Sequence, residues 1–192
     1  MLTKMDMYKI KWTRLQAEIL RLLCIKAGHN MNLRGISRNL KVSATAVSNA
    51  MIELEKEGLI KIKKSKMINL LSIEFNRDNP KAIEMKRVEN LKIIYESGLS
   101  EFLFNEFPGC TIILFGSYSK GEDVWIGEST ENRSDIDIAI IGTKGKEVDL
   151  TRFNKILERM ISINFYKYWK DMHKHLKDNI LNGILLSGGI EL

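Results

Sequence analysis

The chain has 192 residues, which is long enough for one large domain or two small domains with their own cores. No apolar run approaches the roughly 20 residues that cross a bilayer, and the first residues lack a signal peptide's apolar core. The sequence therefore predicts a cytoplasmic protein without a membrane span. Cys24 and Cys110 lie far apart in apolar runs, which indicates reduced core thiols and argues against a disulfide-stabilised fold.

The charge is divided unevenly along the chain. Residues 1–76 hold 14 Lys and Arg against 6 Asp and Glu, a net charge of +8. Residues 77–192 hold 16 against 18, a net charge of −2. This division predicts that the first segment meets a polyanion and that the second does not.

Three helices and two strands are predicted in the basic segment. Leu15, Ile19, Leu22 and Leu23 recur with a helical period, and Gly28 ends that helix. The predicted elements are helices over residues 12–27, 33–40 and 44–57 and strands over 59–64 and 67–71, the strands joined by a turn at Ser65-Lys66.

Three helices followed by a basic hairpin resemble a winged helix-turn-helix domain, expected over residues 1–76. The resemblance implies that the third helix enters the major groove of duplex DNA and that the hairpin wing touches the backbone. The residues expected at the exposed start of the recognition helix are Ser43, Thr45, Ser48 and Asn49. The wing residues expected to make salt-dependent phosphate contacts are Lys61, Lys63, Lys64 and Lys66. A solvated strand edge protected by lysines is the alternative for the wing, and protein binding is an alternative use of the domain.

A helical connector is predicted over residues 77–107. Asn79 can cap a helix that Pro80 begins, and this helix runs to about Ser97 before Gly98. Its apolar stripe, which includes Val88 and Ile94, either packs on the chain's own domains or forms a homodimer interface.

Two motifs in the remaining segment point to a phosphate and metal site. The apolar run over residues 111–115 reads as a strand that ends at Gly116-Ser117, where the backbone can approach a ligand and a hydroxyl can bond a phosphate oxygen. Asp135 and Asp137 precede the apolar run over residues 138–141, so both carboxylates are expected on one face at the head of a buried strand. Two adjacent anions are tolerable mainly around a cation such as Mg²⁺.

Gly-Ser, three residues, Gly, and then Ser-Asp-x-Asp at the head of a strand is similar to the minimal nucleotidyltransferase domain, a relative of the DNA polymerase β superfamily. The resemblance covers residues 108–192 and implies an α/β domain with a mixed sheet, so the whole chain is expected to be α+β. It implies that Asp135 and Asp137 are catalytic and hold Mg²⁺ or Mn²⁺. The residues it implies for binding a nucleoside triphosphate (NTP) are Gly116, Ser117, Lys120 and Gly121.

Active members of that superfamily carry a third acid on an adjacent strand, and this chain departs from the pattern. The corresponding strand is expected over residues 161–166, with Ser162 and Asn164 facing the Asp pair. Asn164 can bind the metal through its carbonyl oxygen, but it cannot take a proton from a hydroxyl at neutral pH.

Two hypotheses follow from the departure. The first is a DNA-binding nucleotidyltransferase that acts on an unknown acceptor, which the resemblance extends to a small helical, toxin-like protein partner. The second is a transcriptional regulator or antitoxin-like protein whose transferase-like domain binds nucleotide with little or no turnover.

Overall fold

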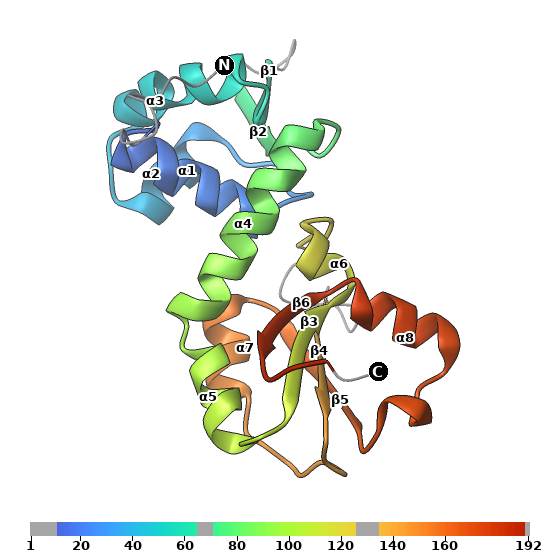
Figure 1. The fold of residues 1–192 in the computed structure, drawn as a ribbon. Coiled ribbons are helices and arrows are strands. Elements are labelled where there is room, and N and C mark those ends of the chain that lie inside the picture. The colour runs from blue at the N-terminus through green and yellow to red at the C-terminus, as the bar shows by residue number, and fades with distance from the viewer. Residues whose placement is uncertain (1–10, 65–70, 126–134, 191–192) are drawn as a thin grey trace. The chain divides into compact units, whose positions relative to one another are not determined.

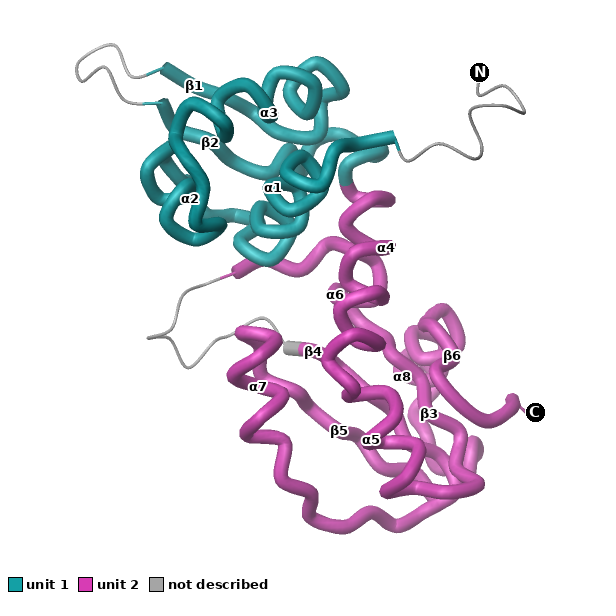
Figure 2. Tube along the Cα trace, turned by 90° about the vertical axis from the view of Figure 1, so that its left-hand side faces the viewer, with its two compact units in different colours: residues 1–82 teal, residues 83–192 magenta. Residues whose placement is uncertain are grey.

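The computed structural model describes residues 11–64, 71–125 and 135–190 (Figure 1). The chain divides into two compact units, residues 1–82 and 83–192 (Figure 2). The boundary falls inside helix α4 (Pro80–Glu96), which begins in the first unit and continues in the second. The separate connector that we predicted over residues 77–107 is therefore not observed. The physical reason is that α4 buries Ile94 completely and Asn90 almost completely, so its larger part belongs to the core of the second unit.

The first unit has the helix and strand order of a winged helix-turn-helix domain. Its elements before α4 are α1 (Arg14–Ile25), α2 (Leu33–Leu40), α3 (Ala44–Lys56), β1 (Ile60–Lys64) and β2 (Leu71–Phe75). β1 and β2 pair antiparallel, and a bridge between Met31 and Ile73 adds the segment between α1 and α2 to this small sheet. The three helices pack around buried residues such as Leu23, Ile36 and Met51.

Local signals in the sequence account for where these helices begin. Thr13 and Gln16 form a capping box at the start of α1. The Asn32 side chain accepts a hydrogen bond from the backbone N–H of Gly35 (2.8 Å) and so caps α2. Ser43 caps α3 in the same way, and Lys41, with φ 55°, makes the tight turn between the two helices. The predicted boundaries of α2 and α3 agree with the structure to within one residue.

The second strand of the wing extends further along the chain than we predicted. Residues 67–71 were expected to form it, and the described strand β2 covers Leu71–Phe75, whereas residues 65–70 lie outside the described residues. The register pairs Ile60 with Phe75, which buries both side chains, and a strand at 67–71 would leave Ile73 and Phe75 without this core position. The expected turn at Ser65-Lys66 lies outside the described residues.

The second unit is a mixed four-stranded sheet with helices on both faces. Its elements after α4 are α5 (Leu99–Glu106), β3 (Thr111–Phe115), α6 (Gly116–Lys120), β4 (Asp135–Ile141), α7 (Thr151–Leu157), β5 (Met160–Tyr166), the 3₁₀ turn η2 (Trp169–Asp171), α8 (Lys174–Leu181) and β6 (Ile184–Ser187). The strand order is β5-β4-β3-β6. β4 and β5 are parallel, whereas β3 is antiparallel to both of its neighbours. The prediction of a mixed sheet in an α+β chain is confirmed.

Successive side chains of β4 lie on opposite faces of the sheet. Ile136, Ile138 and Ile140 are fully buried on the face that α5 and α7 cover in Figure 1. On the opposite face, Ala139 and Ile141 pack in a core with Met172 and Ile180, which lie before and within α8. Asp137 shares this second face and is half-buried at the beginning of the strand. The fold therefore places a carboxylate at the margin of the core under α8.

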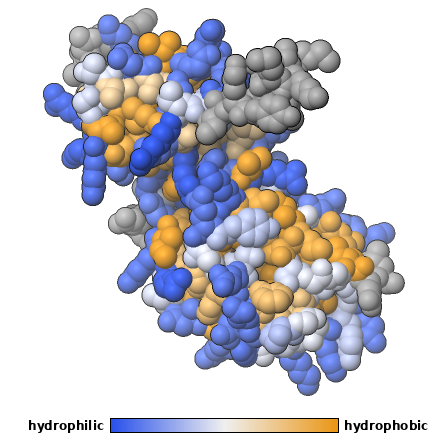
Figure 3. All heavy atoms as spheres, turned by 60° about the vertical axis from the view of Figure 1, so that its left-hand side comes forward, coloured by the Kyte–Doolittle hydropathy of each residue, from blue (hydrophilic) through white to orange (hydrophobic). Residues whose placement is uncertain are grey.

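The described part of the chain contains no helix that is long and apolar enough to cross a membrane. Several large apolar side chains are nevertheless exposed, including Val88 and Tyr95 of α4 and Phe104 of α5. Figure 3 shows apolar side chains exposed among hydrophilic ones on one face of the molecule. The stripe that we predicted on α4 is thus divided, because Ile94 is buried whereas Val88 is 58% exposed. A homodimer interface there stays a prediction.

Candidate functional site

The start of α3 offers a row of exposed polar side chains in the first unit. Thr45, Ser48 and Asn49 are exposed, as we predicted, whereas Val47 and Met51 of the same helix are buried in the core. One face of α3 therefore packs in the core of the first unit, and the opposite face is exposed. Ser43 is also exposed, but its hydroxyl accepts a hydrogen bond from the N–H of Ala46 (3.1 Å), so its first role is to cap the helix.

The lysines of β1 differ in their surroundings. Lys61 forms an ion pair with Asp78, and Lys63 donates to Glu74 (2.7 Å), so both cations are partly offset inside the unit. Each of the two lysines has an acidic neighbour on the hairpin or just after it, and their contacts with phosphates stay a prediction. Lys64 is exposed at the end of the strand. Lys66 lies outside the described residues.

Basic residues on α2 and in the turn after it were missed by the sequence analysis. Arg34, Arg38 and Lys41 are all exposed, and Lys41 stands two residues before the cap of α3. The helix-turn-helix pattern was the signal that could have identified Lys41, because the residues between the two helices necessarily lie near the start of the second helix. Arg34 and Arg38 add exposed positive charge on α2.

Glu57 ties the end of α3 to two other segments of the first unit. Its carboxylate accepts hydrogen bonds from Lys11, from the indole Nε1 of Trp12 (3.1 Å) and from Lys81 (2.8 Å). Burial raises the pKa of Glu57, but the bonds from these three donors outweigh burial and lower the pKa to about 2. The carboxylate is therefore ionised at neutral pH and fixes the start of α4 against the end of α3.

The second unit brings the Gly-Ser bend and Asp137 together. Phe115, the last residue of β3, pairs with Asp137 of β4, so Gly116 follows directly beside the carboxylate. Gly116 has φ 75°, and a Cβ placed on it would lie 2.4 Å from Oδ2 of Asp137. A side chain there would have the strain of a positive φ and would require the Asp137 carboxylate to move, so glycine is favoured. Asp137 and the bend form one local site, as the sequence prediction requires.

The other expected members of this site belong to β4 and β5. The backbone of Asp135 begins β4, but its side chain lies outside the described residues. Ser162 is opposite Asp137 in the parallel pair, whereas Asn164 is opposite Ala139, one position deeper on the same face. Ser162 is therefore the residue of β5 in register with Asp137, and metal binding by Asn164 stays a prediction. The described residues of β5 include no acid.

The residues after the bend have distinct roles. Ser117 is half-buried and Lys120 is exposed, so both can face a ligand. Gly121 cannot, because it is buried against α4: a Cβ on it would lie 2.6 Å from the carbonyl oxygen of Ile83 and 2.8 Å from the nitrogen of Arg87. The prediction of Gly121 as a nucleotide-binding residue is corrected, since its φ of 77° and its lack of a side chain serve the packing of two backbones.

A buried charged cluster lies next to the candidate site in the chain and was missed by the sequence analysis. Asp123 accepts hydrogen bonds from Lys86, from Asn90 (2.8 Å) and from Arg159 (3.0 Å), and all four residues are at most 2% exposed. Arg159 directly precedes β5, and Met160 of β5 pairs with Asp135. The cluster therefore joins α4, the segment after α6 and the start of β5.

The described donors fit a hard divalent cation only in part. No three His, Cys, Asp or Glu side chains gather within residues 11–64, 71–125 and 135–190 in a way that could hold a metal. Asp137 alone supplies a described carboxylate beside the bend. Magnesium commonly binds proteins through one or two carboxylates together with the phosphate oxygens of its ligand.

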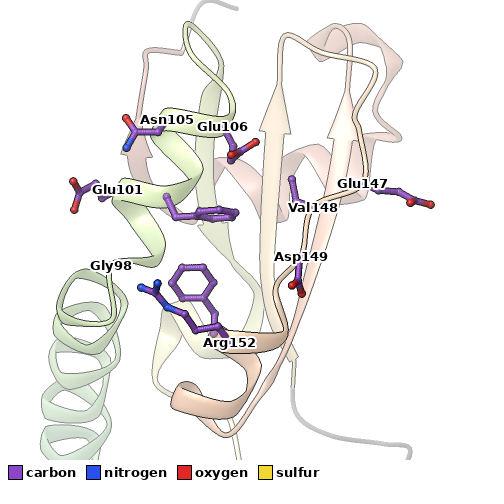
Figure 4. Close-up of a pocket in the computed structure, with 10 residues that line it drawn as sticks. Gly98, Glu101, Asn105, Glu106, Glu147, Val148, Asp149 and Arg152 are labelled. Atoms are coloured by element: carbon purple, nitrogen blue, oxygen red, sulfur yellow. The ribbon is translucent and has the colours of Figure 1, made fainter.

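A separate cavity of about 630 Å³ lies between α5, the loop before α7 and α7 itself (Figure 4). Phe102 and Phe153 line it with their ring centroids 5.1 Å apart, and Arg152 stacks on Phe153. Of its acids, Glu106 is bound by Lys146 (2.7 Å), and Glu147 extends away from the cavity in Figure 4. None of the predicted site residues lines it.

Comparison with known proteins leaves the family of the chain open. No family model matches the chain, and no curated protein matches it. Three solved structures have a partial likeness to it. They are Lactococcus lactis ZitR, a zinc-responsive MarR family member (25% identity, 52% of this chain, 65% of that chain, TM-score 0.37), the adhesin competence repressor AdcR from Streptococcus pyogenes (18%, 54%, 73%, 0.40) and the S. aureus MepR–DNA complex (18%, 50%, 77%, 0.36).

The extent of this likeness is limited. The chain spans less than two thirds of the ZitR chain that it matches. The three TM-scores lie between 0.36 and 0.40. At that level the likeness establishes neither a family nor a function, and the winged helix-turn-helix order of the first unit stands on its own helices, hairpin and bridge.

Proposed function

We infer that the chain is a DNA-binding regulator whose first unit binds duplex DNA and whose second unit binds a nucleotide together with Mg²⁺. The observation that carries the DNA part is the exposed polar start of α3. Thr45, Ser48 and Asn49 project from a helix whose opposite face is anchored by buried residues. Hydroxyl and amide groups of this size hydrogen-bond to base edges in the major groove.

Charge supports the same surface. The first 76 residues carry a net charge of +8, and the exposed cations of the first unit include Arg34 and Arg38 on α2 and Lys41 in the turn before α3. Contacts to phosphates position a protein on DNA and make its affinity fall with salt. Lys64 contributes positive charge from the wing. Lys61 and Lys63 each have an acidic partner, whereas no such partner of Lys64 is found among the described residues.

The DNA part is tested with a duplex selected from a random pool. Thr45→Ala/Asn49→Ala is expected to weaken binding to the selected duplex, because each good base contact contributes about 1–3 kcal/mol of discrimination. Binding to unrelated duplex should stay unchanged. The matched control is Asn105→Ala, an exposed amide in the second unit. Equal affinity of the double variant and the parent for the selected duplex would refute α3 as the reading element.

The nucleotide part rests on Gly116 and Asp137. The backbone of the bend lies directly under a half-buried carboxylate, and Ser117 and Ser162 place two hydroxyl-bearing residues nearby in the chain and in the strand register. Asp137 would hold Mg²⁺, which offsets the charge of the phosphates. Ser117 and the backbone at Gly116 would bind phosphate oxygens, and Lys120 would add a positive charge.

Binding without efficient transfer is the version that the site favours. Transfer of a nucleotidyl group needs a base that takes the proton of the attacking hydroxyl. Ser162 of β5 lies opposite Asp137, Met160 and Asn164 occupy the neighbouring positions on the same face, and none of the three is such a base at neutral pH. A helical protein partner, which the nucleotidyltransferase resemblance implies, stays a prediction.

A labelling experiment separates binding from transfer. The protein is incubated with each labelled NTP, Mg²⁺ and cell extract beside Asp137→Asn, with Glu101→Gln as the control for an exposed carboxylate elsewhere in the unit. We expect Mg²⁺-dependent binding that weakens at least about tenfold in Asp137→Asn, a loss of about 1.4 kcal/mol or more. Label that becomes covalently attached to an acceptor, and that the variant no longer attaches, would support a transferase instead. No NTP binding would refute the nucleotide part.

A further inference from the structure

The second unit contains a direct contact between α6 and α4. α6 begins at Gly116, beneath Asp137, and ends at Gly121, which lies on the backbone of α4. A Cβ at Gly121 would lie within 2.8 Å of both the carbonyl oxygen of Ile83 and the nitrogen of Arg87. Because no side chain separates the two backbones, α6 cannot move toward α4 without displacing it.

The buried cluster binds the same two elements together. Asp123, just after α6, accepts hydrogen bonds from Lys86 and Asn90 of α4. Asn90 also donates to the carbonyl oxygen of Tyr118 in α6 (2.8 Å). These bonds are sheltered from water, where losing one partner of a charged pair is costly. A movement of α6 relative to α4 would therefore break buried hydrogen bonds.

The other end of α4 is fastened within the first unit to the end of α3. Asn79 Nδ2 donates to the carbonyl oxygen of Gly58 (2.9 Å), and Lys81 donates to the carboxylate of Glu57 (2.8 Å). Glu57 is the C-cap residue of α3, the helix whose start carries the proposed DNA contacts. α4 thus has bonded contacts at one end with the recognition helix and further along with the segment that starts at the candidate nucleotide site.

We propose that α4 couples occupancy of the Gly116–Asp137 site to DNA binding by α3. This inference rests on the proposed function. A ligand that engages the backbone at Gly116 changes the favoured position of α6, and the contacts described above carry that change through α4 to Glu57. Because coupling between two sites is reciprocal, duplex DNA changes the nucleotide affinity by the same factor, roughly five- to 150-fold in typical cases.

The test uses the full chain and the selected duplex. Duplex affinity is measured by fluorescence anisotropy with no nucleotide, with Mg²⁺ alone and with saturating Mg²⁺–NTP. We expect saturating Mg²⁺–NTP to change the duplex Kd of the parent at least about fivefold. The variant Asn79→Ser/Lys81→Ala should reduce this change below about twofold. Serine keeps the helix cap but is too short to reach Gly58, whose carbonyl oxygen still accepts from Asn76 (2.7 Å).

The matched control is Lys92→Ala, which removes an exposed lysine from the same helix and only an exposed i,i+4 pair with Glu96. It should keep the full coupling. If Mg²⁺–NTP and duplex both bind the parent and neither alters the affinity for the other, the coupling is refuted while the proposed function stands. Coupling that persists undiminished in Asn79→Ser/Lys81→Ala would overturn the route through the start of α4. Failure of the parent to bind Mg²⁺–NTP would refute the proposed nucleotide function itself, and the coupling with it.

Discussion

Replacing Glu57 by glutamine removes the charge that joins three segments of the first unit. A pKa lowered from 4.5 to about 2 corresponds to an upper bound of about 3 kcal/mol, at 1.36 kcal/mol per pH unit. Lys11 and Lys81 are about half exposed, with side-chain exposures of 53% and 47%, so water screens their contribution. We therefore expect Glu57→Gln to lower the free energy of unfolding by about 1–2 kcal/mol at pH 7.

The pH dependence has a definite sign. Because the folded pKa of Glu57 lies below its unfolded value, the stabilisation is fully present above about pH 4.5 and is lost as the pH falls toward about 2. The stability difference between the parent and Glu57→Gln should therefore shrink over that interval. Both proteins are compared by urea unfolding, with hydrogen exchange assigning the transition to residues 11–82.

The control for this comparison is Glu55→Gln, an exposed carboxylate two residues earlier on α3. It should stay within about 0.5 kcal/mol of the parent, as surface substitutions usually do. If Glu57→Gln were as stable as Glu55→Gln at pH 7, or if its deficit persisted undiminished at pH 2.5, the reasoning about the Glu57 contacts would be wrong.

Three further predictions concern the buried cluster around Asp123, the bend at Gly116 and the wing. Asp123→Asn leaves two buried cations without their carboxylate and should destabilise the second unit by about 3–5 kcal/mol in urea unfolding; a loss below about 1 kcal/mol would contradict the buried network. Gly116→Ala and Gly109→Ala both place alanine at positive φ, a strain of about 1–2 kcal/mol, but only Gly116 has a carboxylate where the Cβ would lie. Gly116→Ala should therefore be the less stable in thermal unfolding and should alone lose Mg²⁺–NTP binding, and equal behaviour of the two would argue against the close approach. Lys64→Ala should reduce the slope of log K for duplex against log salt by about 1, whereas Lys63→Ala should change it less because of its acidic neighbour; the opposite order would exclude the wing as we describe it.

Features governed by neighbours in sequence were predicted well. Asn79 and Pro80 mark the start of α4, as predicted, because capping depends on a few adjacent residues, and α3 begins at Ala44, as predicted. The closeness of Gly116 and Asp137 was also predictable. Each stands at an end of a short buried strand, and the two strands are antiparallel neighbours.

Features governed by distant partners were not predictable from the pattern. β2 runs to Phe75 because Ile73 and Phe75 fill the core, and this depends on their packing partners in the unit. Asp123 lies in a stretch that resembles an ordinary polar loop, and its partners on α4 and before β5 are 33 to 37 residues away in the chain. The register that sets Ser162, and not Asn164, beside Asp137 likewise depends on pairing between strands.

The central claim is that the first unit reads duplex DNA. The most direct test selects bound duplexes from a random pool and then measures their affinity over a series of salt concentrations. The account predicts an enriched sequence whose affinity falls steeply and linearly in log K against log salt, as it does when Lys and Arg displace counterions from phosphates. A pool from which no sequence is enriched, together with a binding constant that does not change with salt, would contradict it.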